Sequence, residues 1–367
     1  MIKHLKVTNL NGFTSFNNDF HRDVNIITGV NGSGKTSVLR LAWYLMSANV
    51  ERVFDDCRFD DLEIETSGFK LSIRPDAQQS ARANVHVVYE DNNSVKRDFS
   101  VKKTNFRINI EQINQYTLKV KPPAPTIMFP TFRRIEGGYS YLNHNVPKTN
   151  ILEDRQLKDP LEYGLRALSQ RLGVYSHRFV TSISTSDVKQ LLMQAYAEAS
   201  SKTNENHTRM AHHIAALVAK YKTDRRKKKE GAYIEKIAEL VHRNAEAQQA
   251  QLAAFTVVSG IIAEFFRSKA VKITEAITFG SGETVLDSDV LSAGEKQFLG
   301  FLAYNAMLCG GCIFIDEPEL SLHTDWQRKL LPALVDQNPG NQLIVATHSP
   351  FIYSMYEDKE LVFGAKP

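Results

Sequence analysis

The sequence predicts an α/β fold in which a mixed or parallel sheet carries an antiparallel β-subdomain and a helical insertion. Short, mainly apolar runs such as Val24–Thr28 and Gln342–Ala346 alternate with helical patterns near both ends of the chain. Strands of this composition indicate a parallel sheet covered by helices on both faces. Between them, residues about 60–130 alternate strand-like runs with turns, whereas residues about 150–275 are polar and mostly helical.

These observations divide the chain into three segments. Residues 1–150 are expected to form the first half of the main domain together with the β-subdomain. Residues 151–275 are expected to form the helical insertion, and residues 276–367 the second half of the main domain. Because the first and last segments both supply strands to one sheet, the insertion interrupts a single domain rather than linking two.

Individual elements are predicted in chain order from local patterns. In the first segment, two strands and a loop precede a helix over about Lys35–Ser47. The strand-like runs that follow are Leu62–Thr66, Phe69–Ile73, Val85–Tyr89, Ser94–Val101 and Thr126–Phe129, with Asn92-Asn93 as a hairpin turn. The insertion contains helical patterns after Ser186-Asp187 and over about 206–222 and 232–268. The last segment contains a loop and helix over 291–308, a strand at Cys312–Ile315 and a helix at 326–335.

Composition places the chain among ordinary globular proteins. Its 367 residues are 43% hydrophobic and 23% charged, and the net charge of +4 neither requires nor excludes a nucleic-acid partner. No apolar run approaches the roughly 18 residues of a membrane span. The N-terminus alternates apolar and polar residues and lacks the apolar core of a signal peptide. We therefore expect a cytoplasmic protein with no membrane partner.

The three cysteines are too few for a disulfide framework and fit a reducing compartment. Cys309 and Cys312 have CxxC spacing, but no second Cys or His pair lies near them in the sequence to complete a zinc site. Two small buried residues are the favoured interpretation, with redox or metal chemistry as the alternative.

The strongest local motif is Gly29-Val-Asn-Gly-Ser-Gly-Lys-Thr36, which matches the P-loop pattern G-x-x-x-x-G-K-[ST] between an apolar strand and a helix. Backbone N–H groups of such a loop and the helix N-terminus can hold phosphates. The residues expected to contact ATP are Gly29, Asn31, Gly32, Ser33, Gly34, Lys35, Thr36 and Ser37. Lys35 would reach the β- and γ-phosphates, and the Thr36 hydroxyl would ligate Mg²⁺.

Two further sites follow apolar strands. Cys312-Ile-Phe-Ile-Asp316-Glu317 ends in two carboxylates, of which Asp316 is expected to hold Mg²⁺ and Glu317 to polarise the attacking water. Acids at strand ends are common, but here they lie downstream of a P-loop. His348 follows the apolar run that ends at Ala346. A lone histidine is more often structural, and its functional interpretation depends on the resemblance described next.

Leu291-Ser292-Ala-Gly294-Glu295 precedes a helix and lies 24 residues before Asp316. It resembles the signature motif of ABC-type ATPases, which implies a P-loop NTPase head of the ABC type. The resemblance assigns Ser292, Gly294 and the adjoining Glu295 to the ATP held by the P-loop of an opposite subunit. It makes His348 a switch histidine that contacts the γ-phosphate, so the predicted catalytic residues are Lys35, Glu317 and His348.

Pro318-Glu319-Leu-Ser-Leu-His323 is similar to the D-loop of ABC ATPases related to SMC proteins, RecF-type repair ATPases and the overcoming-lysogenisation-defect family. Glu319 and His323 act at a dimer interface or cap the next helix; both interpretations stay open. The magnesium-sensing glutamine of the family has only positional candidates, Gln112 and Gln115. Arg133 or Arg134 is the alternative in that role, and Phe13 or Phe16 is a candidate adenine contact.

The resemblance covers about residues 1–50 and 280–367 and implies two ATP molecules, each with Mg²⁺, between two subunits. We expect a homodimer or higher oligomer formed through the ATP site. The preferred function is an ATPase switch or scaffold for a separate effector, in the manner of bacterial antiphage systems. The alternative is a DNA-repair or DNA-clamping ATPase of the SMC/RecF type, with the basic run Arg225–Lys229 on DNA. A transporter subunit and a nucleotide-binding scaffold with little turnover are weaker alternatives.

Overall fold

The computed structural model describes residues 1–75, 84–102, 104–119, 124–131, 160–183, 185–223, 233–246, 271–273, 277–279 and 292–363. Contacts divide the chain into two compact units. Unit 1 comprises Met1–Asp187 and Ser288–Pro367, and unit 2 comprises Val188–Asp287. The three segments proposed from the sequence stay a prediction.

Unit 1 contains a six-stranded parallel sheet. Its strand order is β14 (Glu360–Val362), β3 (Val24–Thr28), β13 (Gln342–Ala346), β12 (Cys312–Asp316), β8 (Thr126–Phe129) and β9 (His177–Phe179). The strands β3, β8, β12 and β13 are buried at every residue, because helices cover both faces.

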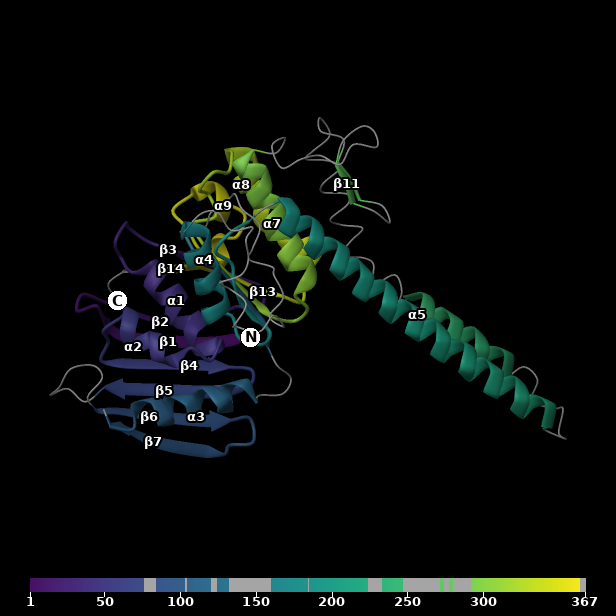
Figure 1. Cartoon of the computed structure of the whole chain (residues 1–367), viewed down its shortest axis with the longest axis horizontal. Helices are drawn as coiled ribbons and strands as arrows, with labels where there is room; N and C mark the ends of the chain where they lie inside the picture. The colour runs from purple at the N-terminus through teal and green to yellow at the C-terminus, as the bar shows by residue number, and fades with distance from the viewer. Residues whose placement is uncertain are drawn as a thin grey trace. The chain divides into compact units, whose positions relative to one another are not determined.

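The two faces of this sheet are covered by different helices. Side chains alternate across a strand, so Phe314 joins the core formed with α1 (Lys35–Met46). On the opposite face, Phe129 of β8 meets the rings of Phe301 and Tyr304 from α7 (Ala293–Met307) at 4.9 and 5.4 Å. The helix α8 (Thr324–Gln337) packs beside α7. Figure 1 shows these helices around the strands.

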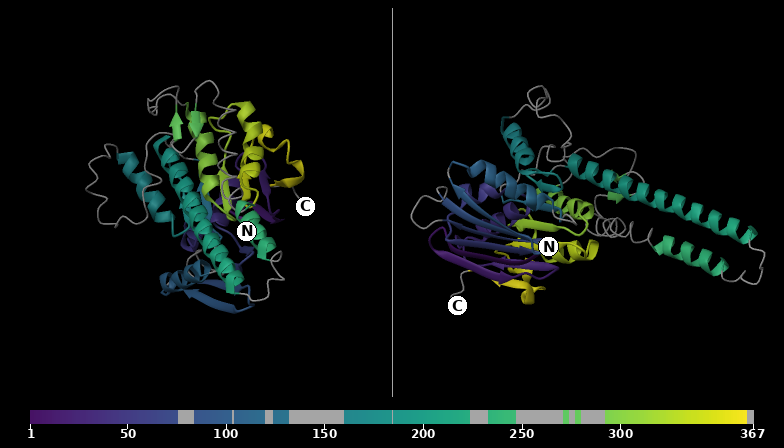
Figure 2. Two further views of the ribbon diagram at one scale, coloured as in Figure 1. Left: turned by 90° about the vertical axis from the view of Figure 1, so that its right-hand side faces the viewer. Right: turned by 90° about the horizontal axis from the view of Figure 1, so that it is seen from below.

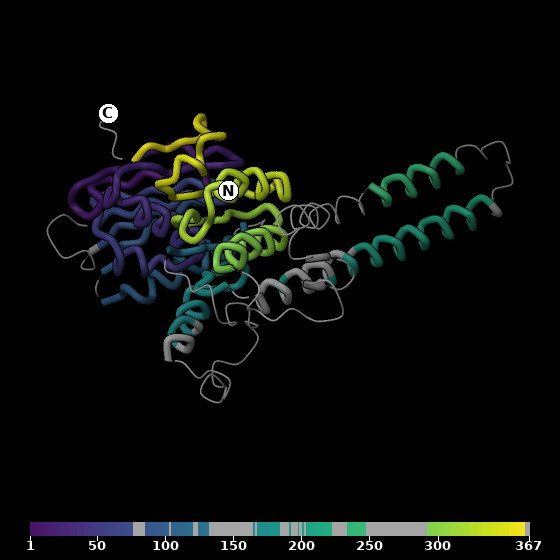
Figure 3. The backbone as a smooth tube through the Cα atoms, turned by 90° about the horizontal axis from the view of Figure 1, so that it is seen from above, coloured from purple at the N-terminus to yellow at the C-terminus, as the bar shows by residue number. Residues whose placement is uncertain are grey.

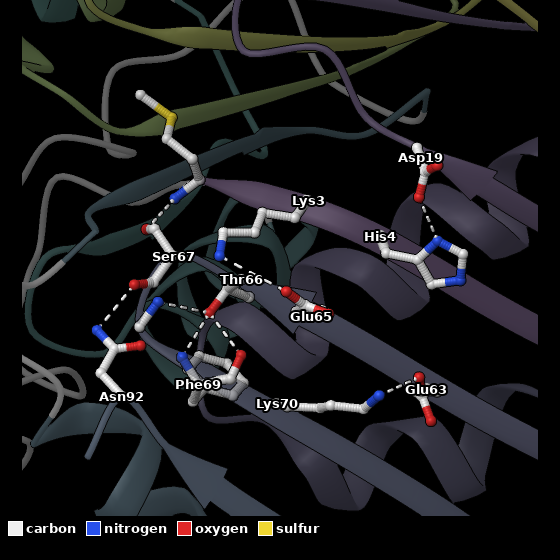
Figure 4. Close-up of polar contacts among 12 residues, drawn as sticks. Lys3, His4, Asp19, Glu63, Glu65, Thr66, Ser67, Phe69, Lys70 and Asn92 are labelled. Atoms are coloured by element: carbon white, nitrogen blue, oxygen red, sulfur yellow. Dashed lines mark hydrogen bonds and ion pairs between the residues drawn. The ribbon is translucent and has the colours of Figure 1, made fainter. Parts of the chain in front are cut away.

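A second six-stranded sheet is antiparallel and comes entirely from the first part of the chain. Its strand order is β2 (Thr14–Asp19), β1 (Ile2–Leu10), β4 (Asp61–Thr66), β5 (Phe69–Pro75), β6 (Asn84–Asp91) and β7 (Lys96–Lys102). Figure 4 shows how the β4–β5 turn is fixed: the Thr66 hydroxyl accepts hydrogen bonds from the N–H groups of Gly68 and Phe69. Lys70 and Glu63 pair across these strands, with Nζ and Oε1 2.7 Å apart.

Further described elements of unit 1 are four helices and a 3-10 turn. They are α2 (Val50–Asp56), α3 (Phe106–Leu118), α4 (Pro160–Leu172), α9 (Pro350–Tyr353) and a 3-10 turn at Glu357–Lys359. The helix α3 packs against β7 and α2. The C-terminal strand β14 runs parallel to β3, and the views in Figure 2 show this yellow segment close to the purple N-terminal strands.

One buried amide joins the two sheets. Gln342, at the start of β13, is fully buried. Its Nε2 donates to the carbonyls of Ile2 (2.8 Å) and His21 (2.7 Å), while its Oε1 accepts from the Ile2 N–H at 2.8 Å. The first strand of the antiparallel sheet is thereby tied to the centre of the parallel sheet.

The described part of unit 2 contains a helical pair and a short hairpin. The 39-residue helix α5 (Thr185–Thr223), which begins within unit 1, runs antiparallel beside a helix over residues 233–246, as Figure 3 shows. Tyr221 meets the Tyr233 ring at 5.7 Å, and the side chains of His207 and Asn244 lie 3.2 Å apart. The strands β10 (Val271–Ile273) and β11 (Ile277–Phe279) pair antiparallel. In the described part of the chain, no helix is long and apolar enough to cross a membrane.

The α/β fold class with parallel and antiparallel sheets is confirmed, but several elements differ from prediction. The helix α2 lies between the stretches for which elements were predicted, and α3 was missed because residues about 60–130 were interpreted as strands and turns. His177–Phe179 lies in a segment that was expected to be mostly helical, and it extends the parallel sheet as β9. The two helices expected on either side of residue 205 form the single helix α5. Cys312 is buried as expected, whereas Cys309 is exposed.

Candidate functional site

The P-loop leads from β3 into α1 and depends on glycine at two tight positions. Gly29 has φ +145°, and a Cβ there would lie 2.7 Å from the carbonyl oxygen of Phe363. Gly34, with φ +108°, is the residue that precedes α1. Both backbone conformations are strained for residues with a side chain, so the loop can wrap tightly only with glycine at these positions.

Lys35 lies at the start of α1 with its ammonium held inside the loop. Its Nζ donates to the carbonyls of Gly29 (3.0 Å) and Val30 (3.1 Å). Burial lowers the pKa of Lys35, and the negative charges of Glu317 and Asp316 oppose that shift. The side chain is only 5% exposed, so an anion entering the loop would meet a cation with little competing water.

The loop also contains a buried hydroxyl whose hydrogen-bonding capacity is unused. Ser33 is 8% exposed, and its Oγ has no hydrogen-bond partner within the described residues. A buried polar group without a partner costs free energy, so such an atom in a phosphate-type loop fits a ligand that accepts a hydrogen bond. Ser33 was one of the residues predicted to contact ATP.

Asp316 ends β12 and is fully buried. Thr36 Oγ1 donates to Asp316 Oδ1 at 3.0 Å, and the Thr131 hydroxyl donates to the other carboxylate oxygen. The oxygens of Thr36 and Asp316, which were predicted to hold Mg²⁺, are thus brought together. Hard oxygen ligands of this kind suit Mg²⁺, so the residues present fit the ion.

Thr131 was not predicted as a site residue. It lies two residues beyond the end of β8, the strand that pairs with β12. The carboxyl ends of neighbouring parallel strands meet at one edge of the sheet. The position of Thr131 just after a strand was therefore the sequence signal that could have identified it as a site residue. The sequence interpretation considered Arg133 and Arg134 of this loop instead, and both lie outside the described residues.

Glu317 and His348 face each other across the cleft. Glu317 has φ +50°, and its N–H donates to the Ala346 carbonyl at 2.9 Å, which links the ends of β12 and β13. His348 Nε2 lies 3.4 Å from Glu317 Oε1. Burial raises the pKa of Glu317, the charges of Glu319 and Asp316 raise it further, and His348 and Lys35 oppose the shift. A carboxylate with a raised pKa next to an imidazole is suited to accepting a proton from water.

A cleft of about 700 Å³ brings most of the predicted residues together. Its lining comprises Asn11, Phe13, Asn31, Gly32, Gly34, Lys35, Thr36, Ser37, Glu317, Glu319 and His348. Phe13 is 64% exposed at this cleft, whereas Phe16 is buried and stacks on Phe363. Of the two aromatic residues considered as adenine contacts, Phe13 therefore has the suitable position.

The signature residues lie elsewhere on unit 1. Ser292 accepts a hydrogen bond from the Glu295 N–H at the start of α7, and the Glu295 carboxylate accepts from the Ser292 N–H at 2.6 Å. Gly294 packs against the next loop, where a Cβ would meet the Ser321 carbonyl at 2.2 Å. None of Ser292, Gly294 and Glu295 is among the described residues that line the cleft.

Other sequence candidates are placed away from the cleft or in structural roles. Gln112 and Gln115 lie on α3, Gln115 lines a separate cavity beside His177, and neither is among the described residues that line the cleft. The His323 ring accepts from the Asp325 N–H at 3.4 Å and caps α8. Glu319 does not cap this helix; it binds the loop that carries His348.

The sequence over residues 24–354 matches the protein family described as "AAA domain, putative AbiEii toxin, Type IV TA system". The chain belongs to this family. Members of this AAA-domain family are P-loop ATPases, so the resemblance to P-loop ATPases predicted from the motifs is confirmed. The match spans the P-loop, Asp316, Glu317 and His348 in one family domain.

Among solved structures, the chain is similar to an Smc head domain with an extended coiled coil bound to the C-terminal domain of ScpA, from Pyrococcus furiosus. The identity is 13% with a TM-score of 0.39, over 96% of this chain and 91% of that one. A second match is an SmcHead bound to the C-winged helix domain of ScpA, with 12% identity, a TM-score of 0.39 and the same coverage.

Proposed function

We propose that the protein binds ATP with Mg²⁺, hydrolyses it to ADP and phosphate, and uses this cycle to switch a separate effector protein. The observation that carries the proposal is the cleft in which Lys35, Glu317 and His348 converge beside Asp316. The family description names a toxin of a toxin–antitoxin system, which supports a role in bacterial antiphage defence.

Each residue has a defined task in this reaction. The P-loop N–H groups, Ser33 and Lys35 bind the phosphates. Thr36 and Asp316 would hold a Mg²⁺ ion, which would supply positive charge next to the phosphate oxygens. Glu317 orients water and accepts its proton, and His348 lies where it can contact the γ-phosphate. When the released phosphate leaves, less negative charge remains in the cleft to bind the Lys35 ammonium.

The position of the signature loop supports a dimer. Ser292 is exposed at the N-terminus of α7, a site suited to binding an anion, yet it does not line the cleft of its own chain. We propose that it binds the γ-phosphate held by a second copy, so that two nucleotides lie between two subunits. ATP would then stabilise a closed dimer or a multiple of that dimer, and hydrolysis would allow the subunits to separate.

Light scattering tests this proposal. Glu317→Gln should retain ATP but hydrolyse it slowly, so we expect its mass to double with ATP and Mg²⁺. Lys35→Ala, the matched control, should remain monomeric because it loses phosphate binding. Ser292→Arg should bind ATP without dimerising. Glu317→Gln that stays monomeric with ATP bound would rule out homodimerisation through this site.

The effector and the DNA alternative need separate tests. The basic run Arg225–Lys229 lies outside the described residues, so the structure gives the DNA-clamping function no specific support. Co-purification of the closed Glu317→Gln dimer from its native host should capture a second protein. Salt-sensitive binding to duplex DNA that is lost when Arg225–Lys229 is neutralised would instead favour the DNA-repair function.

A further inference from the structure

Glu319 occupies a place in the cleft that the proposed reaction does not use. It follows Glu317 by two residues, in the turn between β12 and α8, and it lines the same cleft as His348 and Lys35. A further carboxylate in a cleft for polyphosphate repels the negative charge of the phosphates. Its presence there calls for another role. Its contacts show what that role is.

Both carboxylate oxygens of Glu319 are used by the loop that follows β13. Oε1 accepts from the backbone N–H of His348 at 2.7 Å, and Oε2 accepts from Thr347 Oγ1 at 2.8 Å. Thr347 is fully buried, and its hydroxyl in turn accepts from the Ser349 N–H at 3.0 Å. Hydrogen bonds to an ionised acceptor are stronger than those between neutral groups, so Glu319 fixes three successive residues of this loop.

Fixing the backbone of residue 348 determines where its imidazole lies. The ring is joined to that backbone, and its Nε2 lies 3.4 Å from Glu317 Oε1. If the loop moved by about 1 Å, the imidazole would no longer meet both Glu317 and the phosphate end of the cleft, and such displacements can cost about 100-fold in rate.

The turn that carries Glu319 is itself held by the signature helix of the same chain. Gln297 of α7 donates to the Pro318 carbonyl at 2.9 Å, and Gly294 packs against Ser321 two residues after Glu319. The Leu322 N–H donates to the Glu319 carbonyl at 3.0 Å, which closes the turn. Glu319 therefore projects from a rigid support rather than from a free loop.

We infer that Glu319 is a positioning residue for the hydrolytic step: its two hydrogen bonds to Thr347 and His348 hold the imidazole against Glu317. This inference rests on the proposed ATPase function for its effect on rate. It also makes a structural claim that does not depend on ATP turnover. The two hydrogen bonds from Glu319 to Thr347 and His348, called the tether below, exist whether or not ATP is hydrolysed.

Three substitutions separate positioning from other roles. Glu319→Ala removes both hydrogen bonds, and we expect kcat to fall on the order of 10- to 100-fold while the KM for ATP changes less than about threefold. Glu319→Gln keeps one acceptor for the His348 N–H and should recover most of kcat. Asp358→Asn, an exposed carboxylate outside the cleft, is the control and should match the wild type.

A double-substitution cycle with His348 tests the mechanism. If Glu319 acts through the imidazole, Glu319→Ala should slow a His348→Ala protein by less than about twofold, because the residue that it positions is already gone. Multiplicative losses would show that Glu319 acts independently and would overturn the inference. An equal loss of ATP affinity and of rate in Glu319→Ala would also overturn it.

Hydrogen exchange provides a readout that does not need turnover. The His348 amide should exchange at least about tenfold faster in Glu319→Ala than in the wild type, with little change in Glu319→Gln, since loss of the bond permits local opening. Unchanged exchange would show that the tether is absent. An inactive wild type with the expected exchange pattern would defeat the proposed function but leave the tether established.

Discussion

Both carboxylate oxygens of Asp316 accept hydrogen bonds from threonine hydroxyls, one from a helix and one from a loop. Thr36 comes from the start of α1 and Thr131 from the loop after β8. A fully buried carboxylate has few other sources of hydrogen bonds, so the pair fixes the direction in which Asp316 presents its oxygens. Mutation of such an outer partner of a metal ligand typically costs about 10- to 100-fold in metal affinity or activity.

Thr131 should therefore affect the metal dependence of hydrolysis. Thr131→Val removes the hydroxyl at nearly constant shape, and we expect the Mg²⁺ concentration for half-maximal activity to rise about 10-fold, within the range seen for such partners. Thr131→Ser retains the donor and should behave as the wild type. A Mg²⁺ titration of ATPase rate measures both, and an unchanged Thr131→Val titration would contradict the role given to Thr131.

His177 is a buried histidine outside the cleft, and it makes stability depend on pH. Its ring contacts Thr126 Oγ1 at 2.9 Å, and burial lowers its pKa from 6.5 to about 4. The folded state thus favours the neutral ring. Its contribution to stability is complete above pH 6.5 and is lost as the pH falls towards 4. The loss amounts to roughly 3 kcal/mol at 1.36 kcal/mol per pH unit.

Urea denaturation between pH 7 and 4 measures this effect. His177→Gln cannot take up the proton, so its free energy of unfolding should fall less steeply over that interval than that of the wild type. His86→Gln, on the exposed side of β6, serves as the control because its ring is 54% exposed. Parallel pH curves for His177→Gln and the wild type would refute the assignment.

Among the secondary-structure elements, β13 does most to unite unit 1, because it is central in the parallel sheet and holds β1 through Gln342. Gln342→Leu would deprive the buried N–H and carbonyl of Ile2 of this partner, whereas the His21 carbonyl would keep its hydrogen bond from the Asn25 amide. Unsatisfied buried groups cost about 1–3 kcal/mol each, so we expect a loss of about 3 kcal/mol or more. Urea denaturation measures this loss in the free energy of unfolding, with Gln112→Leu at an exposed position of α3 as the control. A loss under about 1 kcal/mol would contradict the role given to Gln342.

Elements with a strong pattern were predictable from the sequence, and those fixed by tertiary contacts were not. The strands of the parallel sheet at β3, β12 and β13 consist of apolar runs, and each was predicted within a residue or two. His177–Phe179 has only three residues and becomes a strand because β8 provides an edge for it. The polar helix α3 buries only Ile110, Ile113 and Thr117, so its pattern resembled that of the surrounding strands and turns.

The same distinction applies to the candidate site. Motifs located the residues that follow β3, β12 and β13, because glycine and carboxylate positions are visible in a single stretch of sequence. Thr131 and the tether of Glu319 were not found, since each depends on a partner far away in the chain: Asp316 lies 185 residues from Thr131, and His348 lies 29 from Glu319. Threonine and glutamate are common, so spacing alone cannot single them out.

For the whole molecule, ATP binding should appear as added stability. A ligand that binds only the folded state at 100 times its Kd contributes about 2.7 kcal/mol. For a domain the size of unit 1 this corresponds to a rise in melting temperature of roughly 5 °C. Differential scanning fluorimetry of Glu317→Gln with ATP and Mg²⁺ measures it, and Lys35→Ala should show no rise. Equal shifts in both variants would place the binding outside the P-loop.

The strand order of the parallel sheet also determines when the protein can fold during synthesis. The antiparallel sheet is complete once Lys102 has been made, but both neighbours of β3 lie after residue 340. At about 5–20 residues per second, a ribosome takes roughly 12 to 50 s to cover that interval. Through this period β3 lacks its two partners, so ATP cannot assist the early steps of folding, and the nucleotide loop is among the last parts of the chain to form.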